Sequence, residues 1–268
     1  TVSPNYAQEI LTDYYGYGMQ NLLRQRGSDL IGILNGIDYK EFSPEYDSFI
    51  KKKYGKDDYL VGKRENKLAL FKELKVDFDP DRPVLALISR LVNQKGIDLL
   101  ERVFPEMLEH DDFTFILLGS GEQSYEEYFK GLETKFPDKV KVYIGYSNKL
   151  AHMIYAGSDM FLMPSKFEPC GLGQIISLKY GTVPIVRETG GLVDTIEPYN
   201  EYEKVGNGFS FTNFNAHDMM HTIRYALHIY HNDKHEWNKI VKNALDSDFS
   251  WEISAKEYRK LYKDVLKK

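Results

Sequence analysis

The sequence predicts an α/β fold with a doubly wound parallel sheet, and three observations lead to this prediction. From about residue 82, short apolar runs alternate with longer amphipathic stretches. The runs are mostly continuous rather than alternating, as in strands that are covered on both faces. Each run is bounded by Gly, Pro, Asp or Ser. Strand–helix–strand repetition at this spacing implies βαβ units with right-handed crossovers, and therefore a parallel sheet.

The elements follow in order along the chain. Residues 1–30 are expected to be helical after Pro4, over 6–11 and 19–24, and a strand-like run follows at 30–34. Residues 44–66 are polar and indicate an irregular surface segment. The predicted strands are 84–88, 113–118, 140–144, 160–163 and 183–186, with helices between them, for example at 99–109 and 125–136. Further helices are expected at 218–230, 236–245 and 253–266, the last with an apolar stripe that needs a partner surface.

Composition excludes several classes of protein. The 268 residues hold 35 Lys and Arg against 40 Asp and Glu, and a formal charge of −5 argues against a sequence-independent nucleic-acid binder. No apolar run approaches the roughly 20 residues that span a bilayer, so no membrane partner is expected. One cysteine excludes an internal disulfide framework and favours a reducing cytoplasm.

The residues that follow the strands indicate where a ligand binds, because open parallel sheets bind ligands at the carboxyl ends of their strands. Arg90 and Lys95 follow the first strand, Glu168 follows the fourth, and a pair of glycines follows the fifth. Glycines at helix starts let backbone N–H groups approach an anion. Two cations beside two such helix starts suggest a diphosphate site with one carboxylate in it.

Other interpretations of the motifs are weaker. The Gly119–Gly121 turn lacks the third glycine of a dinucleotide fingerprint, and no Walker A lysine is present. Cys170 has no nearby base, which favours a packed or ligand-touching thiol over a nucleophile. No metal site is predicted, since no Cys or carboxylate completes a ligand set around the late histidines. Those histidines are His217, His221, His228, His231 and His235.

Seven motifs in order resemble the bacterial glycogen synthases and plant starch synthases, family 5 of the glycosyltransferases. They are TVSPNYAQEI at 1–10, GILNGID at 32–38, SRL with QKG at 89–96, IGY at 144–146, PSKFEPCGL at 164–172, RETGGL at 187–192 and DFSW at 248–251. The family is made of retaining glucosyltransferases with two Rossmann-like domains, the GT-B architecture. The resemblance covers nearly the whole chain, and the motifs together are specific.

The resemblance implies transfer of glucose from ADP-glucose to the non-reducing end of an α-1,4-glucan. ADP-glucose is then the donor substrate, and no cofactor is expected. Catalytic roles fall on Glu168, Arg90 and Lys95, of which the two cations hold the diphosphate. Gly173 departs from the Thr of many relatives, so a hydroxyl contact to phosphate is absent. The implied donor-binding residues are Asn35 at the interdomain cleft, Tyr146 on the adenine, Cys170 at the glucose, Gly171, Leu172 and Gly173 near the phosphates, and Thr189, Gly190 and Gly191.

The resemblance also implies a division of the chain. Residues 1–30 are expected to finish an N-terminal, acceptor-side domain. The remainder of that domain, which in the family carries a Lys-x-Gly-Gly loop and a histidine that faces the donor glucose, is expected to be absent from this chain. Residues 31–246 form the nucleotide-sugar-binding domain, and 247–268 cross back as a helix. Such a chain is expected to bind ADP but to be nearly inactive alone, in the cytoplasm or, for a plant parent, the plastid. Two alternatives stay open: a UDP-sugar-dependent GT-B enzyme, and a non-catalytic nucleotide- or glycan-binding module.

Overall fold

Six parallel strands form one sheet in the computed structural model of the chain, which describes residues 1–267. The strand order is β3-β2-β1-β4-β5-β6, so the connections run outward in both directions from β1. This is the doubly wound parallel sheet that the sequence predicts. The elements are α1 Pro4–Glu9, α2 Gln20–Arg26, η1 Gly27–Asp29, α3 Tyr59–Leu74, β1 Val84–Leu91, η2 Asn93–Lys95, α4 Ile97–His110, β2 Thr114–Gly121, α5 Gln123–Lys135, β3 Val140–Ile144, α6 Asn148–Gly157, β4 Met160–Met163, α7 Gly173–Lys179, β5 Val183–Arg187, α8 Gly191–Thr195, β6 Phe209–Phe211, α9 Ala216–Asn232, α10 Lys234–Asp246 and α11 Trp251–Val265.

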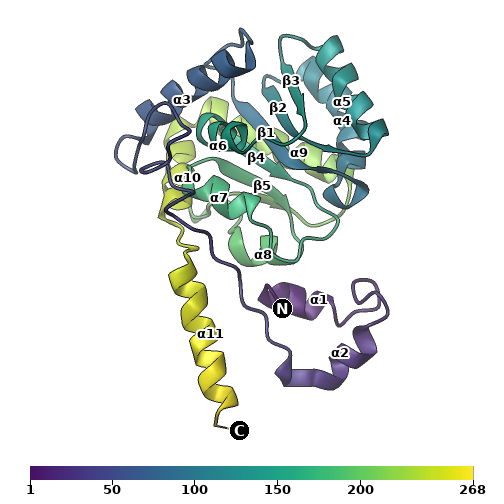
Figure 1. Cartoon of the computed structure of the whole chain (residues 1–268). Helices are drawn as coiled ribbons and strands as arrows, with labels where there is room; N and C mark the ends of the chain where they lie inside the picture. The colour runs from purple at the N-terminus through teal and green to yellow at the C-terminus, as the bar shows by residue number, and fades with distance from the viewer. Residues whose placement is uncertain (268) are drawn as a thin grey trace.

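Helices cover both faces of the sheet (Figure 1). Helices α4, α5 and α9 pack on one side, while α6 and α7 lie on the other, where α3 packs against α6. The first four residues of β1 are buried, as expected for a strand between two helical layers. Phe104, Phe115 and Phe129 form a ring cluster between α4, β2 and α5, with centroids 4.9 and 5.9 Å apart. The core therefore fixes the strand ends at which the candidate site lies.

Four local predictions need correction. Residues 30–34 are not a strand, because they join no sheet in the described chain; their backbone bonds Thr1 instead, through Ile33 N–H to the Thr1 carbonyl and the Thr1 ammonium to the Ile31 carbonyl. The Gly119–Gly121 turn is the end of β2, since its ladder with β1 continues to the pair Leu91–Gly121. The irregular stretch 44–66 ends at residue 58, where α3 begins. A sixth strand, β6, was not predicted; it has only three residues.

A buried polar network anchors the irregular segment before α3. Asp47 Oδ2 lies 2.8 Å from His152 Nδ1 and accepts a hydrogen bond from the Tyr180 hydroxyl at 2.6 Å. Tyr54 donates to the Tyr180 carbonyl at 2.8 Å. All four side chains are buried, so the hydrogen-bonded groups depend on these partners, while His152 Nε2 has no hydrogen-bond partner in the described chain. The network ties a loop to α6 and to the residue that follows α7.

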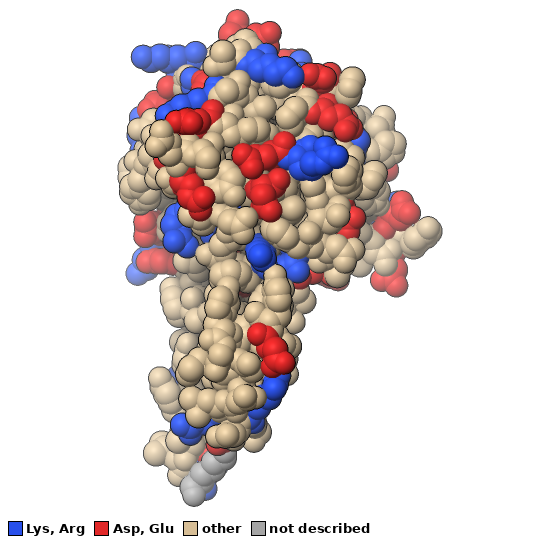
Figure 2. All heavy atoms as spheres, turned by 90° about the vertical axis from the view of Figure 1, so that its right-hand side faces the viewer, with Lys and Arg blue, Asp and Glu red and all other residues tan. Residues whose placement is uncertain are grey.

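The two terminal segments of the chain both lie below the sheet in the view of Figure 1. Helix α1 packs on α8, whereas α11 extends away from the body, and Ser254 is its one buried residue. Three residues of the predicted stripe on α11 are exposed, with Ile253 42%, Tyr262 62% and Val265 59% accessible, whereas Tyr258 and Leu261 are half-buried. Figure 2, which views the right-hand side of Figure 1, shows acidic and basic side chains interspersed over the upper body and fewer charged side chains on the lower part. Within residues 1–267, no helix combines the length and apolarity that a bilayer crossing requires.

Lys63 on α3 carries its ammonium group into the protein. Its Nζ donates to the Thr182 hydroxyl at 2.7 Å and to the carbonyls of Tyr180 at 3.2 Å and Ala156 at 3.3 Å. Burial lowers the pKa of Lys63 to about 7; Asp159 opposes this shift and Lys67 adds to it. The unfolded chain, with an ordinary lysine pKa near 10.4, therefore holds this proton more tightly than the folded chain.

This difference predicts how stability depends on pH. The Lys63 contribution is constant below pH 7, and the free energy of unfolding rises as pH increases from about 7 toward 10.4, by up to about 1.4 kcal/mol per pH unit. Urea unfolding between pH 7 and 9 measures it, with Lys63→Met as the control that cannot titrate. The wild-type profile should be steeper than that of the variant; parallel profiles would contradict the prediction.

Candidate active site

A pocket of about 260 Å³ opens at the carboxyl ends of β1 and β4. Between these two strands the chain order of the sheet reverses, which is where doubly wound sheets bind ligands. The pocket brings together six of the predicted site residues from two segments that lie far apart in the sequence. They are Arg90, Lys95, Glu168, Gly171, Leu172 and Gly173.

An ion pair forms the charged wall of the pocket. Lys95 Nζ lies 2.5 Å from Glu168 Oε2, and the Ser165 hydroxyl donates to the same oxygen at 3.0 Å. Both charged side chains are mostly buried, at 17% and 10% accessible. Within residues 1–267, Glu168 Oε1 accepts no side-chain hydrogen bond, so this oxygen is available to a ligand. The structure thus joins the cation predicted for the phosphates to the carboxylate predicted for the sugar.

Arg90 presents an unneutralised charge beside this pair. Its side chain is exposed and donates weakly to Gln94 Oε1 at 3.4 Å, and it forms no ion pair in the described part of the chain. Gln94 in turn donates to the Phe167 carbonyl at 3.2 Å. Gly96 follows with φ +71°, and a Cβ there would lie 2.1 Å from the Pro164 carbonyl oxygen. The loop after β1 is therefore held against the loop after β4, and both cations stay at the pocket.

The loop after β4 packs on the loop after β5. Gly190 has φ +48°, and a Cβ at this residue would lie 1.9 Å from the Glu168 carbonyl oxygen. Gly191 N–H donates to that same carbonyl at 3.0 Å. Gln174 donates to the carbonyls of Cys170 at 2.9 Å and Gly171 at 3.1 Å. These contacts explain two of the predicted glycines as packing requirements, which fix the position of Glu168.

Asn35, Cys170 and Tyr146 lie outside the pocket lining. Cys170 is 5% accessible, and burial raises the pKa of its thiol, while a hydrogen bond from the Asn35 backbone lowers it. The thiol is thus buried, and its predicted contact with the donor glucose stays a prediction. Tyr146 follows β3, at the edge of the sheet, and is 85% accessible. Its ring is free to stack on a ligand that extends along the strand ends from β1.

Thr189 and Gly190 are not in the lining of the pocket either. Their polar groups donate hydrogen bonds to a side chain of the N-terminal segment. Glu9 Oε1 accepts from the Gly190 N–H at 2.8 Å and from the Thr189 hydroxyl at 3.0 Å. The other oxygen, Glu9 Oε2, is buried without a hydrogen-bond partner in the described chain. Asn5 N–H donates to Asp194 at 2.9 Å. Helix α1 therefore contacts the same loop that the donor is predicted to contact.

The sequence motifs include Glu9, Ser165 and Arg187, for which no role was predicted. Arg187, the last residue of β5, donates to the carbonyls of Lys166 at 2.8 Å and Ser165 at 3.4 Å. Ser165 and Arg187 could have been found by the rule that singled out Arg90, because both lie at the end of a parallel strand. No local signal points to Glu9, which meets Gly190 across 181 residues.

No metal centre accompanies these groups in the described residues, where no three His, Cys, Asp or Glu side chains gather closely enough to hold an ion. The pocket offers two cations and a carboxylate, and it lies where the strand order of the sheet reverses. A family model described as "Glycosyl transferases group 1" matches residues 71–244, which include all of the pocket. The chain belongs to this glycosyltransferase family.

Its relatives are similar over the whole chain. The glycogen synthase of Bacillus cereus (strain Q1) is 52% identical over 265 residues, which cover 99% of this chain and 55% of that protein. The glycogen synthase of Clostridium perfringens is 51% identical over 267 residues, which cover 100% of this chain and 55% of that protein. The chain thus spans about half the length of these relatives. Its structure resembles the catalytic domain of starch synthase IV from Arabidopsis thaliana, bound to ADP and acarbose, with TM-score 0.92 and 38% identity, over 100% of this chain and 55% of that one. This match confirms the resemblance to glycogen and starch synthases and the α/β fold of a GT-B C-terminal domain.

Proposed function

We propose that this glycosyltransferase chain binds ADP-glucose at the β1–β4 pocket and takes part in glucosyl transfer to the non-reducing end of an α-1,4-glucan. One observation carries the proposal: Arg90 lies unneutralised beside the buried Lys95–Glu168 pair, where a sugar diphosphate presents negative charge next to a sugar ring. The glycogen synthase relatives and the ADP bound to the similar starch synthase support this choice. ADP-glucose is the substrate here, and the proposal includes no resident cofactor or metal.

The chemistry that we propose follows from where charge develops. Breaking the bond between glucose C1 and the phosphate oxygen leaves the electron pair on ADP, and positive charge grows on the sugar ring. Arg90 and Lys95 stabilise the diphosphate, and this stabilisation increases as the bond breaks. The Glu168 carboxylate, oriented by Ser165, faces the ring or orients the donor. Tyr146 stacks on the adenine, since an aromatic face suits a base.

We further propose that transfer needs a second domain opposite the pocket. The relatives are nearly twice as long as the part that this chain matches, and one domain provides one wall of a cleft. Helix α1 contacts the loop of Thr189 and Gly190, and the exposed apolar stripe of α11 lies on the same side of the body (Figure 1). Both segments suit contact with such a domain. The chain by itself is expected to bind nucleotide and to transfer little glucose.

Calorimetric titration of the chain with ADP, UDP and a maltooligosaccharide tests the donor assignment. We expect saturable binding of ADP, weaker binding of UDP, and no binding of ADP to an Arg90→Ala, Lys95→Ala double variant. Tighter binding of UDP would point to a UDP-sugar donor. Binding of the oligosaccharide alone would indicate a glycan-binding module and would overturn the proposal. Robust glucosyl transfer by the chain alone would remove the requirement for a second domain.

A further inference from the structure

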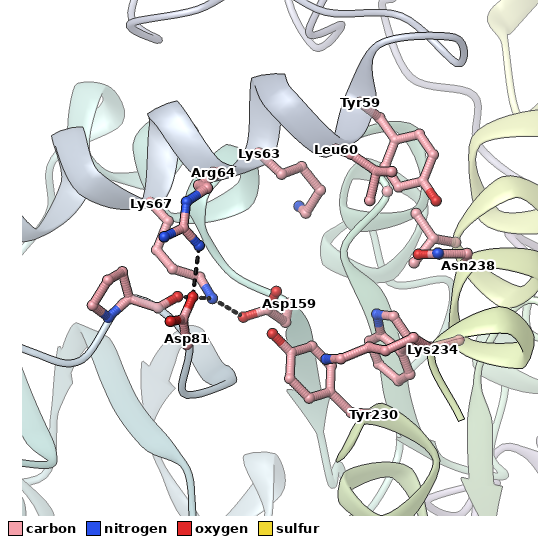
Figure 3. A pocket seen from close by; sticks show the side chains of 14 residues that line it. Tyr59, Leu60, Lys63, Arg64, Lys67, Asp81, Asp159, Tyr230, Lys234 and Asn238 are labelled. Atoms are coloured by element: carbon pink, nitrogen blue, oxygen red, sulfur yellow. Dashed lines mark hydrogen bonds and ion pairs between the residues drawn. The ribbon is translucent and has the colours of Figure 1, made fainter. Parts of the chain in front are cut away.

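A second pocket lies at the amino-terminal ends of the strands, opposite the ends where the candidate active site lies. It has a volume of about 550 Å³, within the range of small-molecule sites. Pro80, Asp81, Asp159 and Gly181, which precede β1, β4 and β5, form its floor, and α3, α9 and α10 supply its walls. Figure 3 shows Lys63 reaching into it from α3 and Lys234 and Tyr230 facing it from the other side. The proposed transfer reaction makes no use of this pocket.

The charges that line the pocket do not balance. Lys67 pairs with Asp159 at 2.7 Å, with only 7% and 13% of these side chains accessible, and Arg64 pairs with Asp81 at 2.6 Å. These two pairs use both carboxylates of the lining. Lys63 and Lys234 have no acidic partner within residues 1–267; Lys234 instead lies over the Tyr230 ring at 3.3 Å. The Lys234 ammonium is thus left to attract an anion, and Lys63, whose pKa is about 7, adds positive charge when it is protonated.

The aromatic part of the pocket lining suits contact with the ring of a ligand. Tyr59, Tyr230 and Trp237 contribute aromatic faces. Tyr59 is 4% accessible, and its hydroxyl has no hydrogen-bond partner in the described chain, although buried hydroxyls usually have one. In Figure 3 this hydroxyl points to the side of the pocket where Asn238 lies. Burial raises the pKa of Tyr59 to about 12, so the hydroxyl stays protonated and can donate a hydrogen bond to a ligand.

We propose that this pocket binds a small phosphate monoester that carries a ring, with the phosphate on Lys234 and the ring against Tyr59 and Trp237. A phosphate monoester bears a charge of about −1.5 to −2 near neutral pH, opposite in sign to the charge of Lys234 and of protonated Lys63. When protonated, Lys63 contributes through its charge rather than by direct contact, because its three donors are already used. A sugar phosphate and a nucleoside monophosphate share this chemistry.

Calorimetry on the full chain distinguishes the possibilities. The probes are fructose 6-phosphate, AMP, inorganic phosphate and uncharged fructose, at about 1 mM and above, where weak ligands still register. We expect one of the two monoesters to bind, more tightly than inorganic phosphate, and fructose not to bind. The monoester that binds identifies the ring as a sugar or a base. Failure of both monoesters, equal binding of inorganic phosphate, or equal binding of fructose would each overturn the proposal.

Variants locate the site. Lys234→Ala should weaken binding at least about tenfold, because a hydrogen bond to a charged group is lost. Tyr59→Phe, which removes only the hydroxyl, should weaken it by a smaller factor. Lys130→Ala on the exposed side of α5 is the matched control and should change nothing. Arg90→Ala should also leave this binding intact; loss of binding in that variant, with binding retained in Lys234→Ala, would place the monoester in the β1–β4 pocket and refute the assignment.

Discussion

Replacing Arg90 or Lys95 with Ala is expected to lower kcat for glucosyl transfer about 100-fold or more, when this chain is part of a protein of the relatives' full length. Arg90 is exposed at the pocket without an acidic partner in the described chain, so its charge is available to the leaving diphosphate. Lys95 is paired with Glu168, and its loss also leaves that carboxylate uncompensated in a site where it is 10% accessible. In the chain alone, each variant should weaken ADP binding about tenfold.

The two variants have matched controls on nearby helices. Arg102→Ala on α4 and Lys130→Ala on α5 remove the same charges from exposed positions outside the pocket, and both should retain kcat and ADP affinity. Steady-state kinetics with ADP-glucose separate kcat from KM, and calorimetry gives the affinity for ADP. If Arg90→Ala and Lys95→Ala keep activity within a few-fold of the parent, these cations have no part in the mechanism.

Replacing Asp47 with Ala is expected to lower the free energy of unfolding by about 3 kcal/mol or more, because a buried charged network loses its acceptor. Burial acts to raise the pKa of Asp47, but hydrogen bonds from His152, Tyr180 and the Phe49 N–H outweigh it, so the pKa lies below its ordinary value. The carboxylate is therefore more stable in the folded chain. Without it, the Tyr180 hydroxyl and His152 Nδ1 remain buried without that partner.

The pH dependence follows with a definite sign. The Asp47 contribution is present above the ordinary aspartate pKa near 3.9 and is lost as pH falls through the lower folded value. Urea unfolding at neutral pH measures the loss of stability in Asp47→Ala, with Asp246→Ala as the control. Asp246 is an exposed carboxylate paired with Lys56, and its removal should cost no more than about 0.5 kcal/mol. A similar loss for both variants would show that the buried network does not stabilise the fold.

The amino-acid sequence determines the sheet and the place of the candidate site. Continuous apolar runs predicted five of the strands, because strands buried on both faces need them. The candidate residues Arg90, Lys95 and Glu168 were predicted from their places at or near the carboxyl ends of those strands; Arg90 itself lies within the last part of β1. Helix α3 was not predicted, since its buried positions include Gly62, Asn66 and Lys67, which interrupt the apolar stripe of an amphipathic helix. The run at 30–34 has strand composition, yet no sheet edge lies beside it to pair with it within the described chain.

Only the tertiary structure joins groups that are remote in the sequence. It places Lys95 on Glu168 across 73 residues and Glu9 on Gly190 across 181. It also gathers α3, α9 and α10 around Asp159 to form the second pocket, which no motif indicates. The physical reason is the range of the signals. Periodicity and turn chemistry act over a few residues, so a sequence reveals its elements, whereas ion pairs and pockets depend on how the sheet brings distant segments together.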